Sequence, residues 1–228
     1  MSLITPRQIL ARALFSPKAV YRAAGQRERR SLATRLLHGG LLLSVIGQLA
    51  SSEFMSDPVR GQGASGLLLV HEYAGLGSAA LVTLFWLWAL FRHGETKLAR
   101  LVPWFSARAI RAVGQDALSQ ARGLWQGELV SAPDGALASA IHGLGLLTVA
   151  AMAITGTVYF LWPAAAISGL VLDVHSTVAN LMWAYLLGHA AMAALHHLLG
   201  EDIVLRMFGI GRGVVMAVAA QGPQKPQH

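Results

Sequence analysis

The sequence predicts an all-α protein that crosses a membrane as a four-helix bundle, and three observations support this class. Hydrophobic residues make up 54% of the 228 residues and charged residues only 13%, about half the charged share of an ordinary soluble domain. Four long apolar stretches contain histidine but almost no other ionisable group. Cysteine is absent, which excludes disulfides, iron–sulfur clusters, thiolate zinc sites and covalently attached c-type haem.

Each apolar stretch is long enough to cross a bilayer. A hydrocarbon core of about 30 Å requires about 20 helical residues. Lipid also requires that every backbone polar group is bonded within the segment. The strict alternation that is typical of barrel strands is missing. We therefore expect membrane helices at about residues 34–52, 66–91, 138–162 and 170–198.

Basic residues lie almost entirely on one side of these helices. Of the 18 lysines and arginines, all but Arg60 precede or open the first helix, lie between the second and third, or follow the fourth. The positive-inside rule then places the N- and C-termini in the cytoplasm. On so apolar a chain, the formal charge of +7 indicates membrane topology rather than nucleic-acid binding.

The four helices form one domain at residues 34–208. Three further segments can be distinguished: one before this domain, one loop within it and one after it. Residues 1–33 are a basic N-terminal segment, in which residues 8–24 form either an amphipathic surface helix interrupted near Pro17 or a solvated tail. The cytoplasmic loop 93–137 is expected to be partly helical and interfacial. Residues 209–228 form a C-terminal tail, and its last eleven residues are expected to be disordered.

Histidines are the main candidate metal ligands in these helices. Polar groups inside a bilayer are costly and usually functional, although a single intramembrane histidine can also serve as a hydrogen-bonding partner between helices. His175 and His189 lie 14 residues apart on one helix. They therefore share a face to within about 40° and are separated by about 21 Å along the axis. This spacing suits two stacked haems, one in each leaflet.

The expected depth in the membrane divides the histidines into a periplasmic group and a cytoplasmic group. His71 and His175 are expected near the periplasmic surface, where they form the only histidine pair available to a haem. His38 and His142 are expected near the cytoplasmic surface, and His189 lies nearest to them in depth. Any two of these three could hold the second haem. Several nearby glycines would let either a porphyrin or another helix approach the backbone: Gly39, Gly40, Gly75, Gly143, Gly145 and Gly156.

Sequence motifs in all four helices point to a known family. The fourth helix carries VHSTVANLMWAYLLGHAAMAALHHLLGEDIVLRMF at residues 174–208, the first carries RLLH, the second VHEYAG, and the third IHGLGLL and ITG. These motifs resemble those of bacterial cytochrome b561, in the larger group that includes the cytochrome b subunits of nickel–iron hydrogenases. The first 30 residues and the 93–137 loop are not covered. Where the family often has His-Trp in the first helix, this chain has His38-Gly39.

The resemblance implies a multi-pass protein of the bacterial inner membrane with two non-covalent b-type haems. Carried over by position, the axial ligands are His38, His71, His175 and His189. The resemblance pairs His38 with His189 and leaves His142 beside the haem or on the quinone side. Two axial imidazoles on one haem favour electron transfer over oxygen binding.

Three functions follow as expectations, in this order. The first is a dihaem cytochrome that passes electrons between a periplasmic-side donor, either superoxide or a protein, and the quinone pool, so that it acts as an oxidoreductase on quinone. The second is a haem-bearing anchor and electron relay for a periplasmic redox enzyme such as a hydrogenase. The third is a metal transporter lined by histidines, without haem. Candidate partners are lipid, quinone, a periplasmic redox protein and a second copy of the chain.

A quinone site needs a protonatable side chain near one haem, because quinone reduction consumes two protons; histidine suits this role near neutral pH. The candidates are His196, His197 and His142 at the cytoplasmic end and Glu72 at the periplasmic end. Asp173 also lies at the periplasmic end, and it is expected simply to be solvated there. The cytoplasmic end is favoured because position 196 lies two turns beyond position 189 of the same helix, about 10 Å along the axis. Three arginines near that end either pair with haem propionates or serve topology alone: Arg35, Arg92 and Arg206.

Overall fold

The computed structural model describes residues 30–55, 66–93, 96–126, 135–198 and 203–208, and within them it is helical with no strand. Four helices are long and apolar enough to cross a membrane: α2 (Leu32–Phe54), α3 (Gly66–Phe91), α6 (Ala136–Leu161) and α7 (Ser168–Leu198). The predicted fold class is confirmed. Helix α3 has the predicted bounds, while α2 extends two residues further at each end, and α6 and α7 begin two residues earlier.

Local hydrogen bonds explain where two of the helices begin. Ser31 caps α2, because its side chain accepts a hydrogen bond from the Thr34 N–H at 3.2 Å, which satisfies one of the unpaired donors of the first turn. Helix α6 starts after Gly135, which has no side chain to cap it. Its Leu137 N–H instead donates to the Asp116 carboxylate at 2.9 Å, a favourable position for a negative charge.

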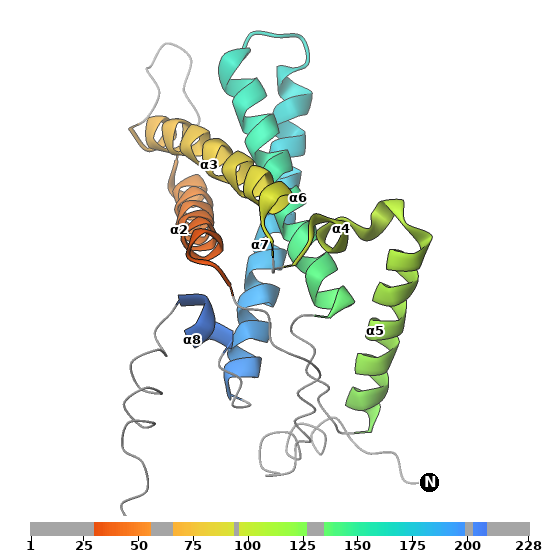
Figure 1. Cartoon of the computed structure of the whole chain (residues 1–228). Helices are drawn as coiled ribbons and strands as arrows, with labels where there is room; N and C mark the ends of the chain where they lie inside the picture. Colours follow the sequence, from red (N-terminus) through yellow and green to blue (C-terminus); the bar gives the residue numbers. More distant parts are fainter. Residues whose placement is uncertain (1–29, 56–65, 94–95, 127–134, 199–202, 209–228) are drawn as a thin grey trace, which may run out of the picture.

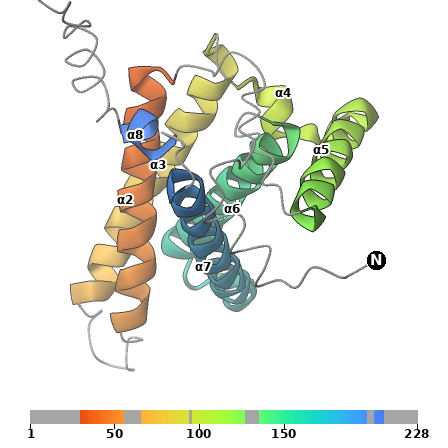
Figure 2. The ribbon, with the colours of Figure 1, turned by 90° about the horizontal axis from the view of Figure 1, so that it is seen from below.

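The spanning helices pack as two pairs that meet along one seam. Helix α2 packs on α3 and α6 packs on α7, while α3 also packs on α6; α2 and α7 make no extensive contact in the described part of the chain. Figures 1 and 2 show the α2–α3 pair on one side and the α6–α7 pair on the other. The small core lies between them: Leu41, Val45, Leu49, Val82, Phe85, Val149 and Met182.

The segment that follows α3 is partly helical, as the sequence predicted. It contains α4 (Leu98–Leu101), a 3-10 turn (Pro103–Phe105) and α5 (Ala107–Trp125). Leu101 and Pro103 are buried, and the segment rests on α6 so closely that the Leu101 carbonyl occupies the space that a Cβ at Gly143 would take. The loop is therefore docked against the bundle.

A short helix that the sequence did not predict closes the described chain. Helix α8 (Ile203–Phe208) returns to the start of α2 (Figure 1), where the Arg35 Nε donates to the Met207 carbonyl at 3.1 Å. The Phe208 ring centroid lies 6.4 Å from that of His38. The predicted surface helix at residues 8–24 and the tail at 209–228 lie outside the described residues.

Replacing Gly143 by alanine should destabilise the protein, because the added methyl group would meet the backbone carbonyl of Leu101. Overpacking of this kind costs about 1–3 kcal/mol. The measurement is thermal unfolding of the purified variant in detergent. Gly77→Ala is the matched control: Gly77 also lies within a spanning helix, but it is exposed and no atom lies within 4 Å of the added methyl group. Equal melting temperatures for the two variants would contradict the prediction.

Candidate functional site

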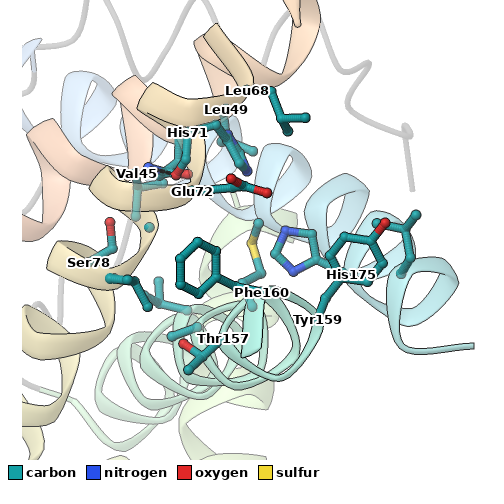
Figure 3. Close-up of a pocket in the computed structure, with 18 of the residues that line it drawn as sticks. Val45, Leu49, Leu68, His71, Glu72, Ser78, Thr157, Tyr159, Phe160 and His175 are labelled. Carbon is teal, nitrogen blue, oxygen red and sulfur yellow. Dashed lines mark hydrogen bonds between the residues drawn. The ribbon is translucent and has the colours of Figure 1, made fainter. Parts of the chain in front are cut away.

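His71 on α3 and His175 on α7 face each other across one pocket. Their ring centroids are 6.4 Å apart and the ring planes are nearly perpendicular. All four spanning helices line the pocket, mostly with apolar side chains. Figure 3 shows the two histidines together with Glu72 and Phe160 around the same space. The structure therefore brings together the two histidines that depth sorting paired.

Both imidazoles of this pair are held by a hydroxyl group. The Ser51 Oγ lies 2.9 Å from the His71 Nδ1, and the Thr155 Oγ1 lies 2.9 Å from the His175 Nδ1. Each hydroxyl also donates to a main-chain carbonyl of its own helix, at 3.0 Å and 2.8 Å respectively. The hydroxyl oxygens therefore accept hydrogen bonds from the Nδ1–H groups, which leaves each Nε2 lone pair available to a metal.

Sequence reasoning missed both hydroxyl groups. Thr155 lies within the ITG motif, and Ser51 stands near the end of the first apolar stretch. Each lies 20 residues before its histidine in the chain, on a different helix. A hydroxyl is a common partner for a ligating histidine, but its contact depends on how two helices cross, which no local pattern encodes.

Three further histidines of the spanning helices form a second cluster. His38 on α2 lies 6.4 Å from His189 on α7, measured between ring centroids. His142 on α6 lies closer, at 5.1 Å from His189. The Tyr185 ring stacks on the His189 ring with centroids 5.5 Å apart and planes only 8° apart. The phenol therefore fixes the plane of that imidazole.

The ring nitrogens of His38 and His142 have different surroundings. The His142 Nδ1–H donates to the Ala138 carbonyl at 2.7 Å. The His38 Nδ1 is buried and has no hydrogen-bond partner among the described residues. Such a buried polar atom needs an explanation, and a ligand that is absent from the structure supplies one.

The glycines near these histidines differ in what lies next to them. Gly143 and Gly145 permit close packing, because an added Cβ would meet the Leu101 backbone and the Tyr185 ring respectively. Gly156 lies against His175, whose Cε1 would be 3.1 Å from an added Cβ. Gly39, beside His38, has open space next to it.

The residues considered for a quinone site are distributed over both ends of the bundle. Glu72 is half-buried and lines the pocket of His71 and His175, whereas Asp173 is exposed, as expected for a solvated group. At the other end, His196 is half-buried and His197 is exposed. They lie in the last turn of α7, beyond position 189.

The three arginines of that end differ in their surroundings. Arg92 is buried, with 8% of its surface exposed. Arg35 is occupied by its hydrogen bond to α8. The side chain of Arg206 lies outside the described part of the structure.

The two pairs suit an iron that already carries four other ligands. Among the described residues, no three histidine, aspartate or glutamate side chains converge on one metal-binding point. Each pair therefore offers two imidazoles and nothing more, the axial set of a haem. This ligand number does not suit a tetrahedral zinc site, which takes three or four protein ligands.

The separations within the clusters distinguish the histidines. His38 and His189 have the same 6.4 Å between ring centroids as His71 and His175. His142 lies closer to His189, at 5.1 Å. The pair of His38 and His189 therefore resembles the first pair more than the pair of His142 and His189 does.

One of three comparisons with known proteins gave a match. The family model described as prokaryotic cytochrome b561 matches residues 29–209, which include all four spanning helices and α8. No curated protein sequence and no solved structure matches the chain.

Proposed function

Because the chain belongs to the prokaryotic cytochrome b561 family, we propose that this multi-pass inner-membrane haem protein binds two b-type haems and passes electrons between a periplasmic-side donor and the quinone pool. The main support for the proposal is that two pairs of histidines, His38 with His189 and His71 with His175, each have ring centroids 6.4 Å apart. The basic residues on one side of the helices support cytoplasmic termini.

His71 and His175 would hold one haem, and His38 and His189 would hold the other. When bound, a haem supplies the one-electron redox chemistry. Two axial imidazoles leave no open position on the iron, which favours electron transfer over oxygen binding. Because His175 and His189 are about 21 Å apart along one helix, the two sites would lie at different depths and connect the two faces of the membrane.

The chain's own side chains would set the geometry of these sites. Ser51 and Thr155 orient the first pair through the Nδ1–H groups. Tyr185 holds the plane of His189. The mostly apolar lining around His71 and His175 excludes water, and burial of a haem in such a lining is one of the means by which a protein sets its potential.

The haem content tests the proposal directly. We expect a b-type optical spectrum and two haems per fully loaded chain in a pyridine haemochrome assay. One haem per chain would contradict the dihaem proposal, and the absence of a b-type spectrum in haem-replete protein would remove it altogether.

Quinone is proposed to react at the end of the bundle that holds His189. His142 and Tyr185 lie beside His189 there, and His196 lies about 10 Å further along α7. The rival location is the pocket of Glu72. Support for the first location comes from His142, His196 and His197 at that end, because imidazole is a side chain that can exchange protons with a quinone.

Three variants that retain both haems distinguish the two ends. We expect quinone-dependent reoxidation of the reduced protein to slow in His196→Ala and to remain near the parent rate in Glu72→Gln. His197→Ala tests the other candidate histidine in the last turn of α7, which is exposed. A large loss in Glu72→Gln with unchanged rates in both histidine variants would move the site to the other end.

A second function, an electron relay for a periplasmic redox enzyme, is favoured by one feature. Only residues 162–167 connect α6 to α7, and Trp162 and Ile167 in this short connection are each 58% exposed. These two exposed apolar side chains offer a partner a contact surface near the pocket. Reduction of the haems by that partner, without reaction of the isolated protein with quinone, would favour the relay. Membership in a haem family leaves no support for the metal transporter.

A further inference from the structure

Helix α5 lies outside the four spanning helices, beside the start of α6 (Figures 1 and 2). Its inner face carries small or short residues that are partly or fully buried: Ala109, Val113, Ala117 and Gly123. Asp116 ties it to the first turn of α6 through the Leu137 N–H and accepts a second hydrogen bond from the Gln120 amide at 3.2 Å. Because α6 is a spanning helix, this tie holds α5 where α6 enters the membrane.

The outer face of α5 has an apolar sector. Ile110, Leu118 and Trp125 are 49%, 57% and 77% exposed. At 100° per residue, these three positions fall within a sector of about 80°. Gly114 and Ala121 complete the same sector. An exposed apolar ridge on a helix at the membrane boundary is suited to contact with acyl chains.

A basic sector lies directly beside the apolar one. Arg108, Arg111 and Arg122 are all exposed and fall within about 60° of one another around the helix. The one acidic residue of α5, Asp116, is on the inner face and bonded to α6. All charged side chains on the exposed surface of α5 are therefore basic.

This combination matches helices that lie in the membrane interface. Such helices place Trp, Phe and Leu toward the acyl chains and arginine toward the headgroups. Tryptophan is enriched at the membrane–water boundary. Guanidinium groups form bidentate hydrogen bonds with phosphate, and basic segments at a membrane surface attract anionic lipids.

We propose that the outer face of α5 is a binding surface for anionic phospholipids of the leaflet that α6 enters, with the apolar sector in contact with acyl chains and the three arginines bound to lipid phosphates. The surface is independent of the haem sites. The sequence predicts that the 93–137 loop lies at the membrane interface. The proposal adds which face of α5 contacts the lipid and that the lipid is anionic.

Two neighbouring labelling sites test the orientation. The chain has no cysteine, so a single introduced cysteine is the only site for a nitroxide label. Leu118→Cys lies in the apolar sector, and Ser119→Cys lies about 100° away, on the far side of the basic sector. In the full-length protein in nanodiscs, we expect oxygen, which concentrates in lipid, to collide preferentially with the label at 118. A water-soluble nickel chelate should collide preferentially with the label at 119.

The role of charge is tested in nanodiscs of phosphatidylcholine alone and of phosphatidylcholine with phosphatidylglycerol. We expect the oxygen-to-nickel collision ratio at 118 to rise when phosphatidylglycerol is added. The rise should disappear when Arg108, Arg111 and Arg122 are all replaced by glutamine. Equal nickel access at 118 and 119 would overturn the proposal and assign the face to water or to an acidic protein. A ratio at 118 that does not depend on lipid charge would overturn the phosphate contacts.

Discussion

His71→Ala and His175→Ala are each expected to lose one haem, and the two variants should lose the same one. Their imidazoles face each other across a single pocket at 6.4 Å between ring centroids. The other described histidines of the spanning helices lie in the second cluster or in the last turn of α7. Removing either axial ligand leaves an iron with an incomplete set. The measurement is a redox titration of each purified variant with optical detection, together with its haem content.

An exposed histidine provides the control for this pair. His93 lies just after α3 and is exposed, so His93→Ala should retain both haems. The decisive comparison is the potential of the haem that remains. If His71→Ala and His175→Ala retain haems of different potential, the two residues do not serve the same site.

His38→Ala and His189→Ala should lose the other haem, while His142→Ala should retain both. The 6.4 Å between His38 and His189 equals the separation of His71 and His175, whereas His142 lies only 5.1 Å from His189. Low-temperature optical spectra of the three variants check this.

His142→Ala is the informative variant, because His142 is the nearest rival to His38. A His142→Ala protein that lacks the haem retained by His71→Ala would show that α6, rather than α2, supplies the second ligand. A small shift of the haem potential with both haems retained fits a residue that lies beside the site.

The spanning helices could be predicted from the sequence because lipid imposes a simple rule. A backbone in hydrocarbon must be helical and about 20 residues long, so the four apolar stretches were located to within two residues. The ends shifted where local chemistry extended the helix. The Ser31 side chain caps α2, so that the helix begins at Leu32, two residues before the predicted stretch.

The sites could be predicted only as far as depth in the membrane determines them. Depth separates His71 from His38, but His38 and His142 lie at the same end, so only packing distinguishes their distances to His189. The contacts of Ser51, Tyr185 and α8 arise from helices that are distant in the chain. No period or motif in one segment encodes how two such segments cross.

Helix α7 supplies one histidine to each pair, and this has a consequence for the order in which the protein is made. Because α7 is the last spanning helix in the described part of the chain, the ribosome has already delivered α2, α3 and α6 to the membrane before either pair can close. During that interval His38 and His71 are inserted without their counterparts. Both pairs are completed by a single event, the arrival of residues 168–198. Cofactor loading that needs both imidazoles is therefore a late step of biogenesis, common to the two sites.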